Sequence, residues 1–92
     1  MKRPENITDT AQLISGIGAS SWFTINQENK HYRIERFSPE GKLECSRLFY
    51  PTPSSFDINK PFVFTYLSHC SLCTIIQNQI TFKFKVYENN NV

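Results

Sequence analysis

The sequence has no apolar run long enough to cross a bilayer, which takes about 20 consecutive apolar residues in a helix. Its first residues, MKRPENITDTAQLISGIG, include two basic side chains but no apolar stretch behind them, so they do not form a secretory signal. Cysteine is also scarce: three is an odd number, whereas small secreted scaffolds usually carry an even set. These absences predict a cytoplasmic protein with reduced thiols and no membrane partner.

Charge of one sign is equally scarce. Ten Lys and Arg against eight Asp and Glu leave a net charge of +2, which is too small to indicate a nucleic-acid or membrane partner. Instead, 39% of the residues are apolar and 14% are aromatic, enough to fill one core. We therefore expect a single folded domain over residues 1–92.

One segment, residues 8–18, has the spacing of a helix. Thr8 or Asp9 can cap its start, and Gly16 or Gly18 can end it. Its apolar residues recur on one helical face: Ala11, Leu13, Ile14 and Ile17. The glycines of SGIGAS close this helix rather than open one, so they do not form a phosphate-binding loop.

The remainder, residues 20–87, reads as strands and turns. Alternating and β-branched residues predict about six antiparallel strands: 20–27, 31–37, 42–50, 62–69, 73–77 and 80–87. Residues 51–61 contain three prolines, which cannot donate to a strand ladder, and predict a long crossover loop. The run FVF is apolar on both faces, which indicates a central strand.

These elements together predict an α+β domain. Its N-terminal helix packs on a curved antiparallel meander of about six strands, with partial closure into a barrel as the alternative. Residues 1–7 form a loose arm and residues 88–92 a frayed tail. The predicted inward residues are Phe23 or Trp22, Ile34, Phe64, Ile75, Phe82 and Phe84. Because a helix of about eleven residues is only ~16 Å long and cannot cover both faces of such a sheet, we expect a homodimer.

The stretch YLSHCSLCTII raises the question of a metal site. Zinc takes four nitrogen or sulfur ligands, usually from two paired motifs, and this chain has one Cys-x-x-Cys pair. The candidate ligands are Cys45, His69, Cys70 and Cys73, with His31 as another histidine. Thr74 stands where a zinc knuckle usually has glycine. We predict no metal site, and keep a metal-stabilised domain as an alternative.

A redox role for the same pair is disfavoured. A reactive Cys-x-x-Cys motif has its first thiol at a helix N-terminus, and the residues after Cys73 are β-branched and alternate. We expect a hairpin instead, in which CSL is the connection and His69 lies opposite Cys73. The thiols then serve as small buried apolar groups.

Catalytic motifs are absent from the sequence: it has two histidines and no Gly-x-Ser-x-Gly or His-Glu-x-x-His pattern. We therefore predict no enzyme and no cofactor. A nucleic-acid surface would need basic strand faces with aromatic platforms. The residues that could supply them are Arg33, Arg36, Lys83 and Lys85 with Tyr32, Phe37 and Tyr87, but Glu35, Glu44 and Glu88 share their segments.

Three phrases, SGIGASSWFTI, YRIERFSPEGKLECSRLF and FVFTYLSHCSLCTIIQN, resemble a family of small uncharacterised bacterial proteins, over the range from Leu13 to Phe84. The resemblance implies a domain of unknown function and carries over no catalytic or binding residues. We predict a small non-enzymatic binding or protein-interaction module with an unknown protein or small-molecule ligand. The alternatives are a single-stranded nucleic-acid binder, or a metal-stabilised domain using Cys45, Cys70, Cys73 and a histidine.

Overall fold

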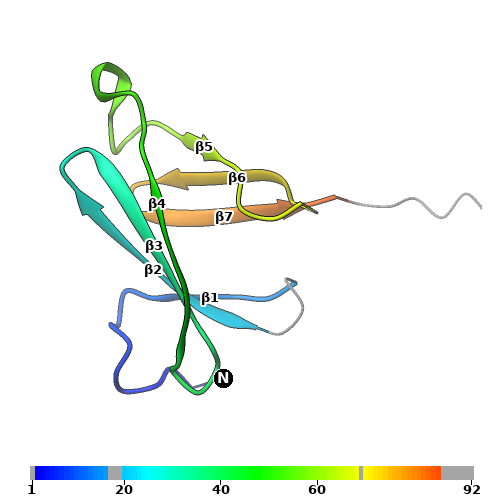
Figure 1. The fold of residues 1–92 in the computed structure, drawn as a ribbon. Helices are drawn as coiled ribbons and strands as arrows, with labels where there is room; N and C mark the ends of the chain where they lie inside the picture. Colours follow the sequence, from blue (N-terminus) through cyan, green and yellow to red (C-terminus); the bar gives the residue numbers. More distant parts are fainter. Residues whose placement is uncertain (1, 17–19, 69, 86–92) are drawn as a thin grey trace, which may run out of the picture.

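The computed structural model describes residues 2–16, 20–68 and 70–85, and its strands form two antiparallel sheets (Figure 1). The four-stranded sheet has the order β1 (Gln12–Ile14), β2 (Ser21–Glu28), β3 (His31–Phe37) and β4 (Leu43–Phe49). The three-stranded sheet has the order β5 (Phe62–Phe64), β6 (Cys70–Ile76) and β7 (Gln79–Phe84). A 3-10 helix, Pro53–Ser55, lies in the connection between the sheets.

The predicted N-terminal helix is wrong, and with it the α+β class. Within the described part of residues 8–18, Ala11 donates to the Thr8 carbonyl in a turn, and β1 follows. β1 pairs with β2 through the register Leu13↔Trp22 and Ile14↔Ser21. A segment this short has little helical stability of its own, so pairing with a neighbouring strand decides its conformation.

In the described part of the chain, no helix is long and apolar enough to cross a membrane.

Two-residue hairpin connections join β2 to β3 and β6 to β7, close to the gaps between the predicted strands 20–27 and 31–37 and between 73–77 and 80–87. Asn29 and Lys30 have φ of 44° and 63°, and Gln77 and Asn78 have φ of 49° and 59°. Two successive positive φ angles match the twist of antiparallel strands. They also fix the register of β2–β3 and β6–β7.

The core lies between the two sheets. Strand alternation sends one set of side chains from each sheet inward. The buried cluster consists of Phe23, Tyr32 and Ile34 from the first sheet with Phe64, Cys73, Ile75 and Ile80 from the second. Of the predicted inward residues, Phe82 and Phe84 are half-buried against this cluster, and Trp22 is buried outside it. Edge-to-face packing of Phe23 on Phe82, with centroids 5.4 Å apart, links the sheets.

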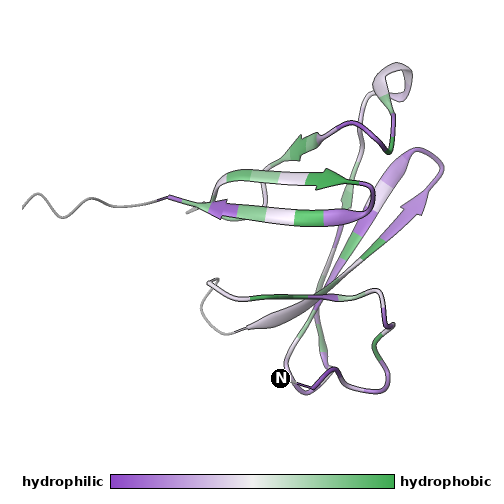
Figure 2. Ribbon diagram, turned by 180° about the vertical axis from the view of Figure 1, so that it is seen from behind, coloured by the Kyte–Doolittle hydropathy of each residue, from purple (hydrophilic) through white to green (hydrophobic). Residues whose placement is uncertain are grey.

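The prediction that FVF forms a central strand is wrong. Among the described strands, β5 pairs only with β6 and is an edge strand, and Val63 is 60% exposed. Its hydrophobic colour along the whole strand in Figure 2 reflects Phe62 and Phe64, which turn toward the other sheet, together with the outward Val63. In the structure, this apolar run has one face that packs on the core, formed by the two phenylalanines, and one exposed valine.

Two side chains join the sheets at their margins. The Gln12 amide donates to the Ile80 carbonyl (3.1 Å) and accepts from the Ile80 N–H (2.8 Å). At the other margin, Arg47 Nη1 donates to the Tyr66 carbonyl (3.3 Å). The inner faces of the two sheets thus cover each other. The homodimer was expected from one six-stranded sheet covered by a short helix, and the described strands instead form two sheets. The homodimer stays a prediction.

Residues 2–7 pack against the β3–β4 turn. Ile7 is 2% exposed, and Asn6 Nδ2 donates to the Gly41 carbonyl (2.8 Å). Gly41 has a φ of +94°, and a Cβ at this position would lie 2.5 Å from Asn6 Oδ1 and 2.9 Å from the Pro4 Cβ. The glycine is needed both for the turn and for contact with the N-terminal segment.

We expect Gly41→Ala to lower the free energy of unfolding by about 1–2 kcal/mol, because a Cβ is strained at positive φ. Urea denaturation measures the loss. The control is Asn6→Ala, which removes one exposed hydrogen bond and should cost less than 1 kcal/mol. Equal stability of Gly41→Ala and the parent protein would contradict the turn geometry.

Candidate functional site

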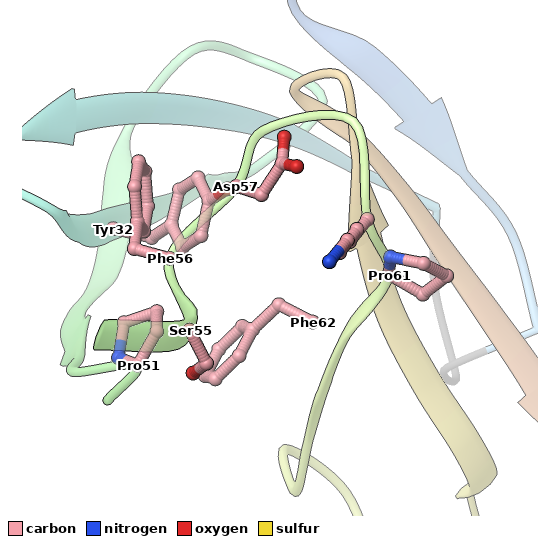
Figure 3. A pocket seen from close by; sticks show the side chains of 8 residues that line it. Tyr32, Pro51, Ser55, Phe56, Asp57, Pro61 and Phe62 are labelled. Carbon is pink, nitrogen blue, oxygen red and sulfur yellow. The ribbon is translucent and has the colours of Figure 1, made fainter. Parts of the chain in front are cut away.

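A cavity of about 230 Å³ opens between the 51–61 connection and the start of β5 (Figure 3). Its walls come from three parts of the chain: Tyr32 on β3, residues 51–61, and Phe62 on β5. Figure 3 shows Pro51 and Ser55 on one side of the cavity and Pro61 on the other. The pocket thus forms where the connection leaves one sheet and enters the next.

The sequence of the connection accounts for its shape. Its three prolines keep it out of either sheet. Asp57 turns the chain, because its carboxylate accepts the Asn59 N–H (2.9 Å) and its carbonyl accepts the Lys60 N–H (3.0 Å). Gln77, in the β6–β7 turn, then donates its N–H to the Ile58 carbonyl (2.8 Å). The connection is therefore fastened to the three-stranded sheet.

Aromatic rings form the floor of the pocket. Tyr32 is 1% exposed and packs on Phe56 and Phe62, with ring centroids 5.6 Å and 5.7 Å away. Phe62 in turn stacks on Phe64, at 6.0 Å and an interplanar angle of 8°. The floor is continuous with the core, which holds these rings in place.

Polar groups mark one end of this apolar surface. Burial raises the pKa of the Tyr32 hydroxyl, and the negative charge of Asp57 raises it further. The hydroxyl therefore stays protonated at neutral pH. Within the described residues, neither Asp57 nor Lys60 forms an ion pair, so one carboxylate and one ammonium remain uncompensated at the rim.

The cysteines lie elsewhere, and not as predicted. β6 begins at Cys70, so CSL is part of a strand rather than a hairpin connection. Cys73 lies opposite Phe64 on one side and Phe82 on the other, with its side chain in the core. His69, predicted opposite Cys73, lies outside the described residues. A register shift between Cys70 and Leu72 interrupts the alternation that would have revealed the strand.

The candidate metal ligands are not assembled in the described part of the chain. There, no three His, Cys, Asp or Glu side chains lie close enough together to hold an ion. Cys45 is on β4, close to Tyr66, whose pKa is raised by burial and then by this thiol. His31 lies beside Tyr50, with ring centroids 5.0 Å apart, and 3.5 Å from Glu28. All three cysteines are free thiols.

The basic residues proposed for nucleic acid are also separated. Arg33 lies 3.3 Å from Glu28. Arg36 is on the opposite face of β3, where it donates to Ser21 (3.0 Å) in a half-buried position. Tyr32, the first proposed stacking platform, is buried in the core. Tyr87 and Glu88 lie outside the described residues. The structure therefore does not bring this set together on one surface.

Only part of the pocket can be recognised in the sequence. The proline-rich connection stood out as a long loop, but the part played by Tyr32, about twenty residues earlier, depends on tertiary packing. A tyrosine in a strand of alternating polar and apolar residues indicates a core position and does not indicate a pocket.

The comparisons with known proteins identify a family without describing an activity. A family model described as the DUF6695 C-terminal domain matches residues 11–87. It confirms the predicted resemblance to an uncharacterised domain family. Neither the curated proteins nor the solved structures contain a match.

Proposed function

Because the chain belongs to the DUF6695 C-terminal domain family, which has no assigned function, we propose a function from its geometry: a small non-enzymatic binding module. Its pocket would take one large apolar side chain of a protein partner. The observation that carries this proposal is a pocket floored by aromatic rings from both sheets, beside a connection that is fastened to the three-stranded sheet.

The size of the pocket supports a single side chain. Its volume of about 230 Å³ is below the ~300–1,000 Å³ of pockets that enclose drug-sized ligands and cofactors. One aromatic side chain can bury about 150–250 Å² of surface on such a floor. A residue of this size anchors many protein interfaces.

The polar end of the pocket favours an aromatic side chain with a donor group. Asp57 Oδ1 already accepts the Asn59 N–H, and the second carboxylate oxygen has no hydrogen bond within the described residues. A tyrosine hydroxyl or a tryptophan N–H can donate to this oxygen, whereas phenylalanine cannot. The pocket would therefore prefer Trp and Tyr over Phe.

Titration with N-acetyl amides of Trp, Tyr, Phe and Gly, followed by NMR, tests the proposal. We expect the Trp and Tyr compounds to shift the signals of Phe56, Asp57 and Phe62, with weaker effects from Phe and none from Gly. Phe56→Ala should weaken binding roughly tenfold, because it removes one ring from the floor of the pocket. Tyr50→Ala is the matched control, since Tyr50 is 69% exposed and does not line the pocket.

The Asp57→Asn variant tests the polar end separately. It should abolish the advantage of Trp and Tyr over Phe or reduce it to less than twofold, because an amide is a weaker acceptor than a carboxylate. If none of the four compounds shifts the pocket signals at millimolar concentration, the proposed function is wrong.

A further inference from the structure

β5 has an open edge. Its three residues pair with β6 in the register Phe62↔Ile75, Val63↔Thr74 and Phe64↔Cys73. Among the described residues, no backbone hydrogen bond reaches β5 from its other side. Because successive residues of an antiparallel strand direct their N–H and C=O groups to opposite sides, part of the β5 backbone faces outward without a strand partner.

The opposite edge of this sheet, on β7, is occupied at Ile80. There, the Gln12 amide makes both hydrogen bonds with the Ile80 backbone, as a neighbouring strand would. The three-stranded sheet also has one strand fewer than the sheet that it faces. Of the two edges, that of β5 is therefore the one whose backbone has no side-chain hydrogen bond among the described residues.

The open edge of β5 adjoins the pocket. Pro61, directly before β5, and Phe62, its first residue, both line the cavity (Figure 3). Phe62 turns its ring inward onto Tyr32, whereas Val63 points to solvent. On an added antiparallel strand, the residue opposite Phe62 would point to the same face, with its Cβ about 4.5–5.5 Å from that of Phe62. Its side chain would enter the pocket.

We propose that the partner is an extended peptide segment that adds a strand to the edge of β5 and places one Trp or Tyr side chain in the pocket. This inference rests on the proposed function and specifies how the partner binds. Main-chain hydrogen bonds would supply the orientation, and the pocket would supply the side-chain preference. Proline has no N–H, so Pro61 donates no bond and the pairing is confined to the short β5. The short edge also limits pairing between copies of the chain.

The main-chain bonds can be tested with the peptide acetyl-Thr-Val-Trp-Val-Thr-amide and two derivatives. One derivative is N-methylated at Trp, and the other at the valine that follows. In a strand, these two N–H groups point to opposite edges, so only one of them can face β5. We expect one derivative to bind about fivefold more weakly than the parent peptide, the effect of one lost hydrogen bond, and the other to bind with unchanged affinity.

Amide hydrogen exchange locates the contact on the protein. The parent peptide should slow exchange within Phe62–Phe64, and acetyl-Trp-amide, which fills the pocket alone, should not. If both methylated derivatives bind as tightly as the parent peptide, or if protection appears on β4 instead, strand addition is wrong while pocket binding stands. If neither the peptide nor acetyl-Trp-amide binds, the proposed function itself fails.

Discussion

Replacing Ile75 by alanine is expected to lower the free energy of unfolding by about 3–4 kcal/mol. Ile75 is 0% exposed and lies between Phe62 and Ile80 in the middle of the three-stranded sheet. Removing its outer carbons leaves a cavity between two sheets that are held by backbone ladders and cannot close on it. A domain of this size has a total stability near the lower end of ~5–15 kcal/mol, so a substantial unfolded population should appear at moderate temperature.

The matched control is Ile76→Ala. Ile76 is the same residue type, one position along the same strand, but it points to the other face and is 36% exposed. Its replacement should cost less than about 1 kcal/mol. Urea denaturation of the parent and the two variants measures both losses. Equal losses would mean that β6 does not have the facing shown here.

The facing of several strands could be predicted because it depends on local alternation. Tyr32 and Ile34 alternate with charged residues in β3, and the inward set in β7 begins with Ile80. Both two-residue hairpins contain an asparagine, a residue that tolerates positive φ. Here the pattern and the tertiary structure agree because one face of each strand is buried.

The N-terminal segment could not be predicted in the same way. Four apolar residues at helical spacing within eleven positions do not separate a helix from a short strand. The decisive contacts of β1 are its pairing with β2 and the bonds from Gln12 to Ile80, which is 68 positions away. Such long-range bonds leave no periodic trace in the sequence.

The pocket was missed for a related reason. Its connection stands out through its prolines, but its floor belongs to rings that read as core residues in separate strands. The spacing of the cysteine pair matches the Cys-x-x-Cys motif of metal and redox sites. In the structure that spacing spans a strand with a register shift, and Cys73 has the role of a small apolar side chain.

The burial of Cys73 also predicts a loss of stability at alkaline pH. Burial, followed by a hydrogen bond with Cys70, raises the pKa of the Cys73 thiol from 9.0 to about 11. Between these two values the unfolded chain has released the thiol proton and the folded chain still holds it. Stability is therefore complete below pH 9 and falls as the pH rises toward 11. We expect Cys73 to contribute a loss on the order of 2 kcal/mol by pH 11.

Urea denaturation at a series of pH values, with Cys73→Ala as the comparison, isolates this contribution. The variant loses some packing at every pH, but its stability should change less between pH 9 and 10 than that of the parent. Burial also raises the pKa of Tyr32 and Tyr66 above 10.0, so they act at higher pH and are present in both proteins. Alkylation at pH 8 gives a second measure, because a Cys73 pKa of about 11 in the folded protein instead of 9.0 leaves about a hundredfold less thiolate, and the thiol is buried. Cys73 should therefore react far more slowly in the folded protein than in the chain unfolded by urea. Parallel stability curves for the two proteins, together with equal labelling of Cys73 in the folded and the unfolded protein, would show that Cys73 is not enclosed between the sheets.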